Sequence, residues 1–234
     1  MKSFLMLGQY NMAGRGVIGT VPEIKNNKCF MLRNGRWQLM GEPINPDRDW
    51  SIHDGVCLAT SFADEFAKHF NEEVGLIPCA DGGTSIAQWQ PGELLYDHAI
   101  AQAKLAQRTS EIVGILWHQG ENDCYNSEIA NKYHDRFMNV YTQLYKDLNL
   151  PQNTPFIIGE LGDFCRFSEN GALKALDQVK ETHLKLCKKL PNAVFVSSKG
   201  LTCKEDNVHF DAKACREFGI RYFNEYLKYL ENKK

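Results

Sequence analysis

The sequence predicts an α/β protein in which helices cover both faces of a parallel sheet. Short apolar runs alternate along the chain with longer segments of helical periodicity, which is typical of strand–helix–strand units. The apolar runs are also almost uniformly hydrophobic, as in IVGILW and PFIIG. Strands are uniformly hydrophobic in sequence when both faces of a parallel sheet are buried.

The first half of the chain contains three strands separated by two helices. The apolar run SFLML predicts the first strand, and two further short apolar runs predict the next two. Longer stretches of helical pattern lie between and after them. In order, the expected elements are a strand at 3–7, a helix at 59–70, a strand at 75–78, a helix at 94–109 and a strand at 112–117.

The second half repeats this rhythm and ends with a helix. Helical patterns again alternate with short apolar runs, and the last pattern is followed by the charged end ENKK. The expected elements are a helix at 128–148, a strand at 155–159, a helix at 172–189, a strand at 193–197 and a closing helix at 211–232. Ligands of such sheets bind beyond the carboxyl ends of the strands, so the functional residues are expected in the loops that follow them.

Residues 17–54 fit no regular period and contain Pro22, Pro43 and Pro46. A loop of this length inside a compact domain is usually functional or disordered. Trp37 and Trp50 favour an ordered, packed loop.

Length and charge describe one ordinary globular domain, residues 1–234. The chain has 43% hydrophobic and 24% charged residues, and its net charge is 27 − 29 = −2. Such a balance argues against a nucleic-acid-binding protein and against a polybasic protein of membrane surfaces. No repeat or long Pro/Gly/Ser linker divides the chain.

The N-terminus and the cysteines favour a cytoplasmic protein. About five apolar residues precede Gln9, too few for a signal peptide or a membrane span. The eight cysteines form no CxxC pair and no zinc-ligand cluster, so free thiols are expected, with disulfides and structural zinc as the less favoured alternatives.

Several loops after the expected strands carry small or polar residues, which is where catalytic groups are commonly displayed. Asp206 and His209 have a spacing that can bring a carboxylate against imidazole Nδ1–H and so stabilise a proton-accepting imidazole. The alternative is that Asp206, or Asp211, caps the final helix. Gly82–Gly83 and Asn122 could donate hydrogen bonds to an oxyanion, or form an ordinary turn and loop.

Four ordered blocks of the sequence are GQYNMAGRG, CADGGTSIAQW, WHQGEND and DNVHF. They resemble blocks of the SGNH (GDSL-like) hydrolases, in particular of their carbohydrate O-acetylesterase branch, which includes sialate O-acetylesterase-like and acetylxylan esterase-related proteins. In that branch the first block is GQSNMAGRG. Weaker similarity at 55–63 and 159–161 extends the resemblance over nearly the whole chain.

The resemblance implies a three-layer α/β/α sandwich with a flavodoxin-like parallel sheet, the SGNH hydrolase fold. It also implies hydrolysis of acetyl esters on sugars by a Ser-His-Asp mechanism without a metal or organic cofactor. His209 takes the role of general base and Asp206 that of its partner, while Gly83 and Asn122 become oxyanion donors. Additional oxyanion or substrate-binding candidates from the same blocks are Gln9, Gln119 and Glu121, with a bracing role in the third block as the alternative for Glu121.

The nucleophile position is occupied by Tyr10 where the family has Ser. A phenol oxygen lies roughly 6.5 Å from its Cα, beyond the point where the oxyanion donors converge. The ring would also fill the space of the acetyl group, so we expect inactivity or strong impairment.

Three explanations for Tyr10 stay open. It is a made or accidental substitution in an otherwise complete esterase, a mark of a natural pseudoenzyme that binds carbohydrate, or a group that itself acts, as tyrosine does in some glycosidases. Thr84 and Ser85 are considered as substitute hydroxyls, but turn capping is the favoured interpretation. The expected partner is a small-molecule or oligosaccharide acetyl ester, with neither nucleic acid nor membrane.

Overall fold

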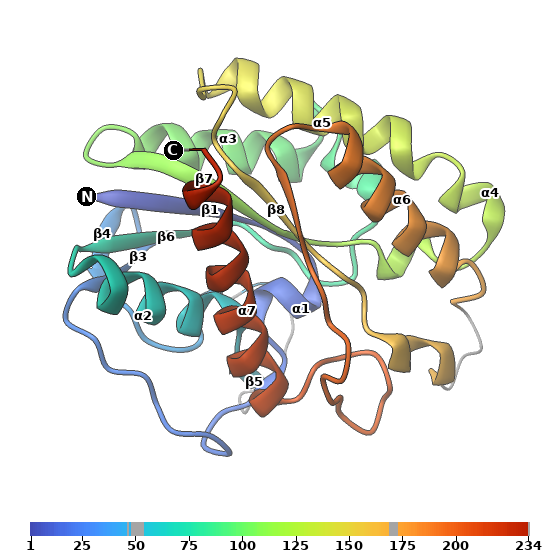
Figure 1. Cartoon of the computed structure of the whole chain (residues 1–234), viewed down its shortest axis with the longest axis horizontal. Coiled ribbons are helices and arrows are strands. Elements are labelled where there is room, and N and C mark those ends of the chain that lie inside the picture. The colour runs from blue at the N-terminus through green and yellow to red at the C-terminus, as the bar shows by residue number, and fades with distance from the viewer. Residues whose placement is uncertain (46, 48–53, 169–172, 234) are drawn as a thin grey trace.

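The computed structural model describes residues 1–45, 47, 54–168 and 173–233, which form a central sheet between layers of helices (Figure 1). The seven strands of this sheet are β1 (Lys2–Gly8), β3 (Cys29–Arg33), β4 (Arg36–Leu39), β6 (Val74–Pro78), β7 (Glu111–His118), β8 (Phe156–Gly159) and β9 (Ala193–Val196). Their order across the sheet is β4-β3-β6-β1-β7-β8-β9. Each neighbouring pair is parallel except β3 and β4.

Two helical layers cover the sheet. The helices are α1 (Tyr10–Ala13), α2 (Leu58–Phe70), α3 (Leu94–Ala106), α4 (Ser127–Ala130), α5 (Tyr133–Asp147), α6 (Leu176–Lys189) and α7 (Ala212–Glu231). Helices α2 and α7 pack together on one face, and α3, α5 and α6 lie on the other (Figure 1). The predicted α/β fold with a parallel sheet and flanking helices is confirmed.

The strands are apolar because side chains of both faces are buried. Along β1, Leu5 and Leu7 join the core beneath α3, α5 and α6, while Phe4 and Met6 join the core beneath α2 and α7. Successive strand residues point to opposite faces, so a strand covered on both sides has no polar positions to spare. The uniform hydrophobicity seen in the sequence follows directly from this covering.

The prediction that residues 17–54 lack regular structure is wrong for part of the segment. Strands β3 and β4 form a hairpin that extends the main sheet, and β2 (Gly16–Val17) pairs with β5 (Asp54–Val56) in a second, small sheet. The hairpin turns at Asn34–Gly35, whose φ angles are 53° and 73°. An Asn-Gly pair is a strong hairpin signal because both residues tolerate positive φ, and the sequence contained it. Trp37 is half-buried beside this turn, and Trp50 lies outside the described residues.

Two other predicted elements differ in detail. The helix expected at 128–148 is two helices, α4 and α5, separated by Asn131 and Lys132. The helix expected from residue 172 begins at Leu176. Helix boundaries depend on local capping geometry, which periodicity does not report.

The eight cysteines are free thiols, six of them buried. None of the described helices combines the length and the apolar character needed to span a bilayer. Within the described ranges, no group of three His, Cys, Asp or Glu side chains is arranged to hold a metal ion.

Candidate active site

The four sequence blocks meet at the carboxyl edge of the sheet. Tyr10 follows β1, the Gly82–Gly83 pair follows β6, and Asn122 lies in the 3₁₀ helix Glu121–Asp123 after β7. The loop carrying Asp206 and His209 connects β9 to α7. In a parallel sheet the carboxyl ends share one edge, so segments distant in sequence converge there.

A glycine makes the turn from β1 into α1 possible. Gly8 has φ 141°, and a Cβ at this position would overlap the backbone carbonyl of His118 on β7. Only glycine permits that close approach of two strands together with that backbone angle. The chain therefore turns sharply after Gly8, and Tyr10 becomes the first residue of α1 at the edge of the sheet.

His209 and Asp206 form the predicted pair. His209 Nδ1 lies 2.8 Å from Asp206 Oδ2, and Asp206 Oδ1 accepts the backbone N–H groups of Val208 and His209 at 2.8 and 2.9 Å. Burial raises the pKa of the Asp206 carboxyl group, but the hydrogen bonds from the His209 side chain and from the backbone outweigh it, and the pKa is lowered. Asp211, not Asp206, caps α7 by accepting the Ala214 N–H at 2.8 Å.

The second ring nitrogen of His209 is buried and has no hydrogen-bond partner among the described residues. A carboxylate on Nδ1 favours the tautomer in which Nδ1 carries the proton, so Nε2 presents a lone pair. The imidazole is thus arranged to accept a proton, although none of the described hydroxyl groups is bonded to it.

Tyr10 occupies the space between His209 and the glycine pair. The two rings meet edge to face with centroids 4.9 Å apart, and the Arg15 guanidinium lies 4.7 Å from the Tyr10 centroid. A Cβ on Gly82 would overlap the ring, and a Cβ on Gly83 would lie 2.6 Å from the Tyr10 hydroxyl. The phenol oxygen therefore reaches past the imidazole to the glycine turn.

The two predicted oxyanion donors adjoin each other. Asn122 Nδ2 donates to the Gly83 carbonyl at 2.6 Å, which joins the second and third blocks. Gly83 has φ 72°, in the left-handed region that favours glycine. One amide proton of Asn122 is used in this contact, and the other is left for a ligand.

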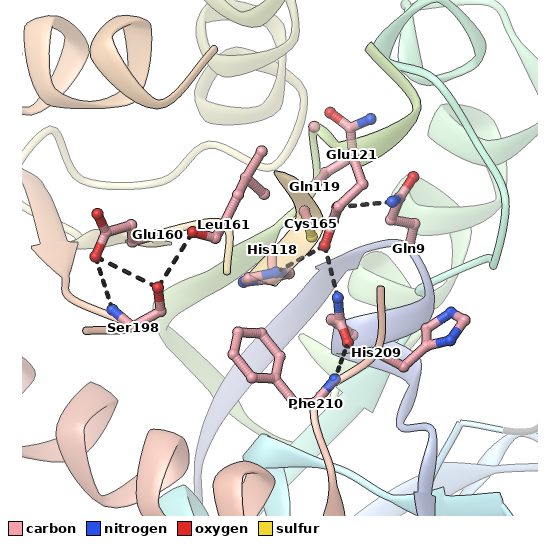
Figure 2. Close-up of polar contacts among 12 residues, drawn as sticks. Gln9, His118, Gln119, Glu121, Glu160, Leu161, Cys165, Ser198, His209 and Phe210 are labelled. Carbon is pink, nitrogen blue, oxygen red and sulfur yellow. Dashed lines mark hydrogen bonds and ion pairs between the residues drawn. The ribbon is translucent and has the colours of Figure 1, made fainter. Parts of the chain in front are cut away.

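Gln9, Gln119 and Glu121 have fully buried side chains directed into the protein. Figure 2 shows the Glu121 carboxylate at the centre of a polar cluster, where it accepts Gln9 Nε2 at 2.6 Å and contacts His118 Nε2 at 3.1 Å. Gln119 Nε2 donates to Asp123 Oδ2 at 2.6 Å and to the Thr84 carbonyl at 3.0 Å. These contacts brace the loop after β7, and a substrate contact by the three side chains stays a prediction.

Most neighbouring residues have structural roles. Trp89 and Trp117 are 1% and 0% exposed and pack against each other in the core. The Thr84 hydroxyl donates to the Asp81 carbonyl at 2.7 Å, and Ser85 is part of a capping box with Gln88. These hydroxyl groups cap turns, as the favoured interpretation of the sequence predicts.

Two supporting residues were not singled out from the sequence. Asp47 Oδ2 accepts Arg15 Nη2 and the Gly82 N–H, both at 2.7 Å, and so links the first and second blocks. It lies in the segment without periodicity, where no pattern points to it. Asn11 contacts both the third block and the His209 loop, and its position beside Tyr10 in the first block was the available signal.

Comparison with known proteins relates the whole chain to esterases. Residues 1–228 match the family described as carbohydrate esterase, sialic acid-specific acetylesterase. An Arabidopsis thaliana protein named as a probable carbohydrate esterase is 31% identical over 243 residues, covering 96% of this chain and 89% of that protein.

Solved structures agree in fold. The crystal structure of the Arabidopsis protein has a TM-score of 0.85 at 31% identity and covers 97% of this chain and 98% of that one. NanS has a TM-score of 0.81 at 14% identity, covering 99% and 98%. A carbohydrate acetylesterase from Xanthomonas citri has a TM-score of 0.66 at 17% identity, covering 94% and 55%. At these lower identities the likeness concerns the fold.

Proposed function

The chain belongs to the carbohydrate esterase family of sialic acid-specific acetylesterases, and from this premise we propose that its site is organised to hydrolyse O-acetyl esters on sugars. We also propose that Tyr10, at the nucleophile position, prevents or strongly impairs that reaction in this chain. The observation that carries the proposal is the His209–Asp206 pair, whose Nε2 is buried beside the nucleophile position without a partner among the described residues.

The pair supplies the proton transfer that acyl transfer needs. With Asp206 holding Nδ1–H, Nε2 of His209 can accept a proton from an attacking hydroxyl group. The same nitrogen can then return the proton to the sugar oxygen as it leaves the acetyl group. The Asp206 carboxylate stabilises the positive imidazolium between these two steps.

The oxyanion of the tetrahedral intermediate needs donors placed in advance. By family resemblance these are the Gly83 N–H, an Asn122 amide proton and the backbone N–H of residue 10. Their proximity supports the assignment, because Asn122 is already bonded to the Gly83 carbonyl and the Tyr10 ring extends to Gly83.

Tyr10 obstructs this arrangement in two ways. It has no hydroxyl group on Cβ, so no atom at the position of a seryl Oγ can give its proton to His209 and attack the ester. Its ring lies over Gly82 and Gly83, where the acetyl group would bind. The phenol itself is a poor substitute, since no hydrogen bond joins it to His209 Nε2 in the described part of the chain.

A non-catalytic carbohydrate-binding protein is the second candidate, and the packing of Tyr10 favours it. The ring has an edge contact with His209 and a cation–π contact with Arg15, each within ordinary distances. A site that accommodates tyrosine this well is compatible with a protein that has lost hydrolysis and kept a sugar cleft.

Hydrolysis of an aryl acetate and of acetylated oligosaccharides tests the proposal. Tyr10→Ser should raise the rate by at least about 10³-fold over the chain as it stands. Tyr10→Ala is the matched control, because it opens the same space without supplying a nucleophile. The double variant Tyr10→Ser, His209→Ala should lose the gain.

The outcomes separate the two candidates. Activity in Tyr10→Ser alone supports a Ser-His-Asp esterase interrupted at one position. Absence of hydrolysis in every variant would contradict the proposal, and binding of oligosaccharides to the unmodified chain would then support the second candidate.

We also propose that the protein acts in the cytoplasm, with imported oligosaccharides as substrates. Finding most of the native protein exported would contradict that location.

A further inference from the structure

One side chain holds both peptide groups that flank His209. Asn11 Nδ2 donates to the Val208 carbonyl at 3.1 Å, and the Phe210 N–H donates to Asn11 Oδ1 at 3.0 Å. The carboxamide therefore pairs with the backbone on either side of His209 as a neighbouring strand would. Asn11 is 2% exposed, so water competes little for these bonds.

Glu121 sets the orientation of the Asn11 amide. The second proton of Asn11 Nδ2 goes to Glu121 Oε1 at 2.7 Å. Turning the amide over would place Asn11 Oδ1 against the Glu121 carboxylate and the Val208 carbonyl. Oxygen atoms that can only accept hydrogen bonds would then face each other, and no proton would lie between them. With the observed orientation, all three polar contacts of Asn11 are satisfied.

The carboxylate is ionised at neutral pH. Burial raises the pKa of Glu121, but the charge of His118 and hydrogen bonds from His118 and Asn11 outweigh it and lower the pKa to about 2. The Gln9 amide donates to the other oxygen. A carboxylate with this many donors is a rigid support for Asn11.

The remaining backbone groups of His209 are bonded within its own loop. The His209 N–H donates to Asp206 Oδ1 at 2.9 Å, and the His209 carbonyl accepts the Lys204 N–H at 2.8 Å. Asn11 adds the connection from this loop to α1, where it is the residue next to Tyr10. The distance between the nucleophile position and the imidazole thus depends on Asn11.

We propose that Asn11, oriented by Glu121, is a positioning residue that holds His209 at the nucleophile position. The effect of Asn11 on turnover rests on the proposed function, because it requires His209 to act as the base. The effect of Asn11 on the conformation of the His209 loop does not require catalysis. The effects on turnover and on the loop can therefore be measured separately.

The kinetic test uses the Tyr10→Ser background. Adding Asn11→Ala should lower kcat for an aryl acetate by about 10- to 100-fold and change KM by less than about twofold, since a misplaced base slows chemistry more than binding. Asn11→Asp keeps the shape and the acceptor for Phe210 but loses the donated bond to the Val208 carbonyl, and it sets a second carboxyl group against Glu121. It should lower kcat in the same direction, and it replaces the alanine variant if that one does not fold.

Asn192→Ala is the matched control in the same background. Asn192 is 1% exposed and, like Asn11, makes three buried hydrogen bonds, to Tyr141, Tyr145 and Thr154. It precedes β9 at the amino end of the sheet, away from the site. Loss of a buried amide destabilises both variants, but only the Asn11 variants should lose kcat. An equal loss in the two would overturn the proposal.

The structural test uses the chain as it stands, with Tyr10 present. Hydrogen exchange of the Phe210 amide should become at least about fivefold faster in Asn11→Ala, beyond the change of core amides, and should be unaffected in Asn192→Ala. Unchanged exchange of the Phe210 amide would contradict the proposed role of Asn11 in holding the His209 loop. If Tyr10→Ser proves inactive while Phe210 exchange responds as expected, the proposed function fails and the role of Asn11 in holding this loop is supported.

A double variant tests whether Glu121 acts through Asn11. Glu121→Gln alone should also lower kcat in the Tyr10→Ser background, because its amide nitrogen replaces one of the two oxygens that accept Gln9 Nε2 and Asn11 Nδ2. Combined with Asn11→Ala, it should add much less than the product of the two single effects. Independent, multiplying effects would show that Glu121 does not orient Asn11.

Discussion

At position 10 the size of one side chain decides which atoms can meet His209. A serine would end one bond beyond Cβ, whereas the tyrosine ring continues past His209 to the Gly82–Gly83 turn. The same turn accepts this ring because it has no side chains of its own. The stability effect of a substitution at position 10 should therefore depend on whether Gly82 and Gly83 are present opposite it.

Substitution of Gly82 measures this coupling. In the chain as it stands, Gly82→Ala should lower the free energy of unfolding by about 1–3 kcal/mol, since a Cβ there overlaps the Tyr10 ring. In the Tyr10→Ser background the cost should be smaller by about 1 kcal/mol or more, and the cost that is left comes from Arg15 Nη2, 2.7 Å from the added Cβ. Urea denaturation of the four proteins checks this, and an equal cost in both backgrounds would mean that the ring does not lie on the turn.

At the level of elements, the β3–β4 hairpin shows how a local signal extends the sheet. Strand β3 pairs in parallel with β6, and β4 then covers the edge of β3. The connection works because Asn34 and Gly35 both adopt positive φ, which matches the twist of a two-residue hairpin turn. The hairpin thus depends on the conformational freedom of its turn.

Gly35→Ala should destabilise the protein by about 1 kcal/mol. Its Cβ would have room, with Leu105 Cδ2 at 3.9 Å, so the cost arises from φ 73° alone. Gly41→Ala is the control, because that glycine has no positive φ and no atom within 4 Å of an added Cβ. Thermal or urea unfolding should show a loss for Gly35 and little change for Gly41. Equal behaviour would argue against the turn geometry.

At the scale of the whole molecule, buried polar groups join the loop after β7 to the helical layer. His183 on α6 is completely buried, with Nε2 3.0 Å from the Tyr133 hydroxyl, and Tyr133 donates to the Gln119 carbonyl at 2.9 Å. Burial, with an added contribution from the charge of His118, lowers the pKa of His183 to about 3. The folded protein therefore holds this histidine neutral over most of the acidic range.

This neutrality predicts a loss of stability in acid. The unfolded chain takes up a proton at His183 below about pH 6.5, while the folded chain does not until about pH 3. The contribution of His183 to stability should therefore fall as pH falls from 6.5 toward 3, by at most about 1.4 kcal/mol per pH unit. His183→Gln should flatten that part of the profile, measured by urea unfolding between pH 4 and 7. The exposed His98→Gln is the control and should leave the slope unchanged; a slope unaltered by His183→Gln would contradict the prediction.

Local patterns in the sequence were sufficient for the main fold and for part of the site. Strands covered on both faces must be apolar throughout, so the runs at β1, β6, β7, β8 and β9 were visible without any tertiary information. Because parallel strands share one carboxyl edge, the polar loops after them could be placed together. The Asp206–His209 contact spans three residues, and its spacing alone made the pairing predictable.

The tertiary structure alone decided where the remaining side chains point. Gln9 and Glu121 are 112 residues apart, and the hydrogen bond between them directs both side chains inward, a direction that no local pattern reports. The Tyr10 ring likewise takes its direction from Arg15 in its own block and from Gly82 and His209, which come from two distant parts of the chain. Periodicity reports which face of an element is covered, whereas the direction of a polar side chain depends on partners that only folding brings near.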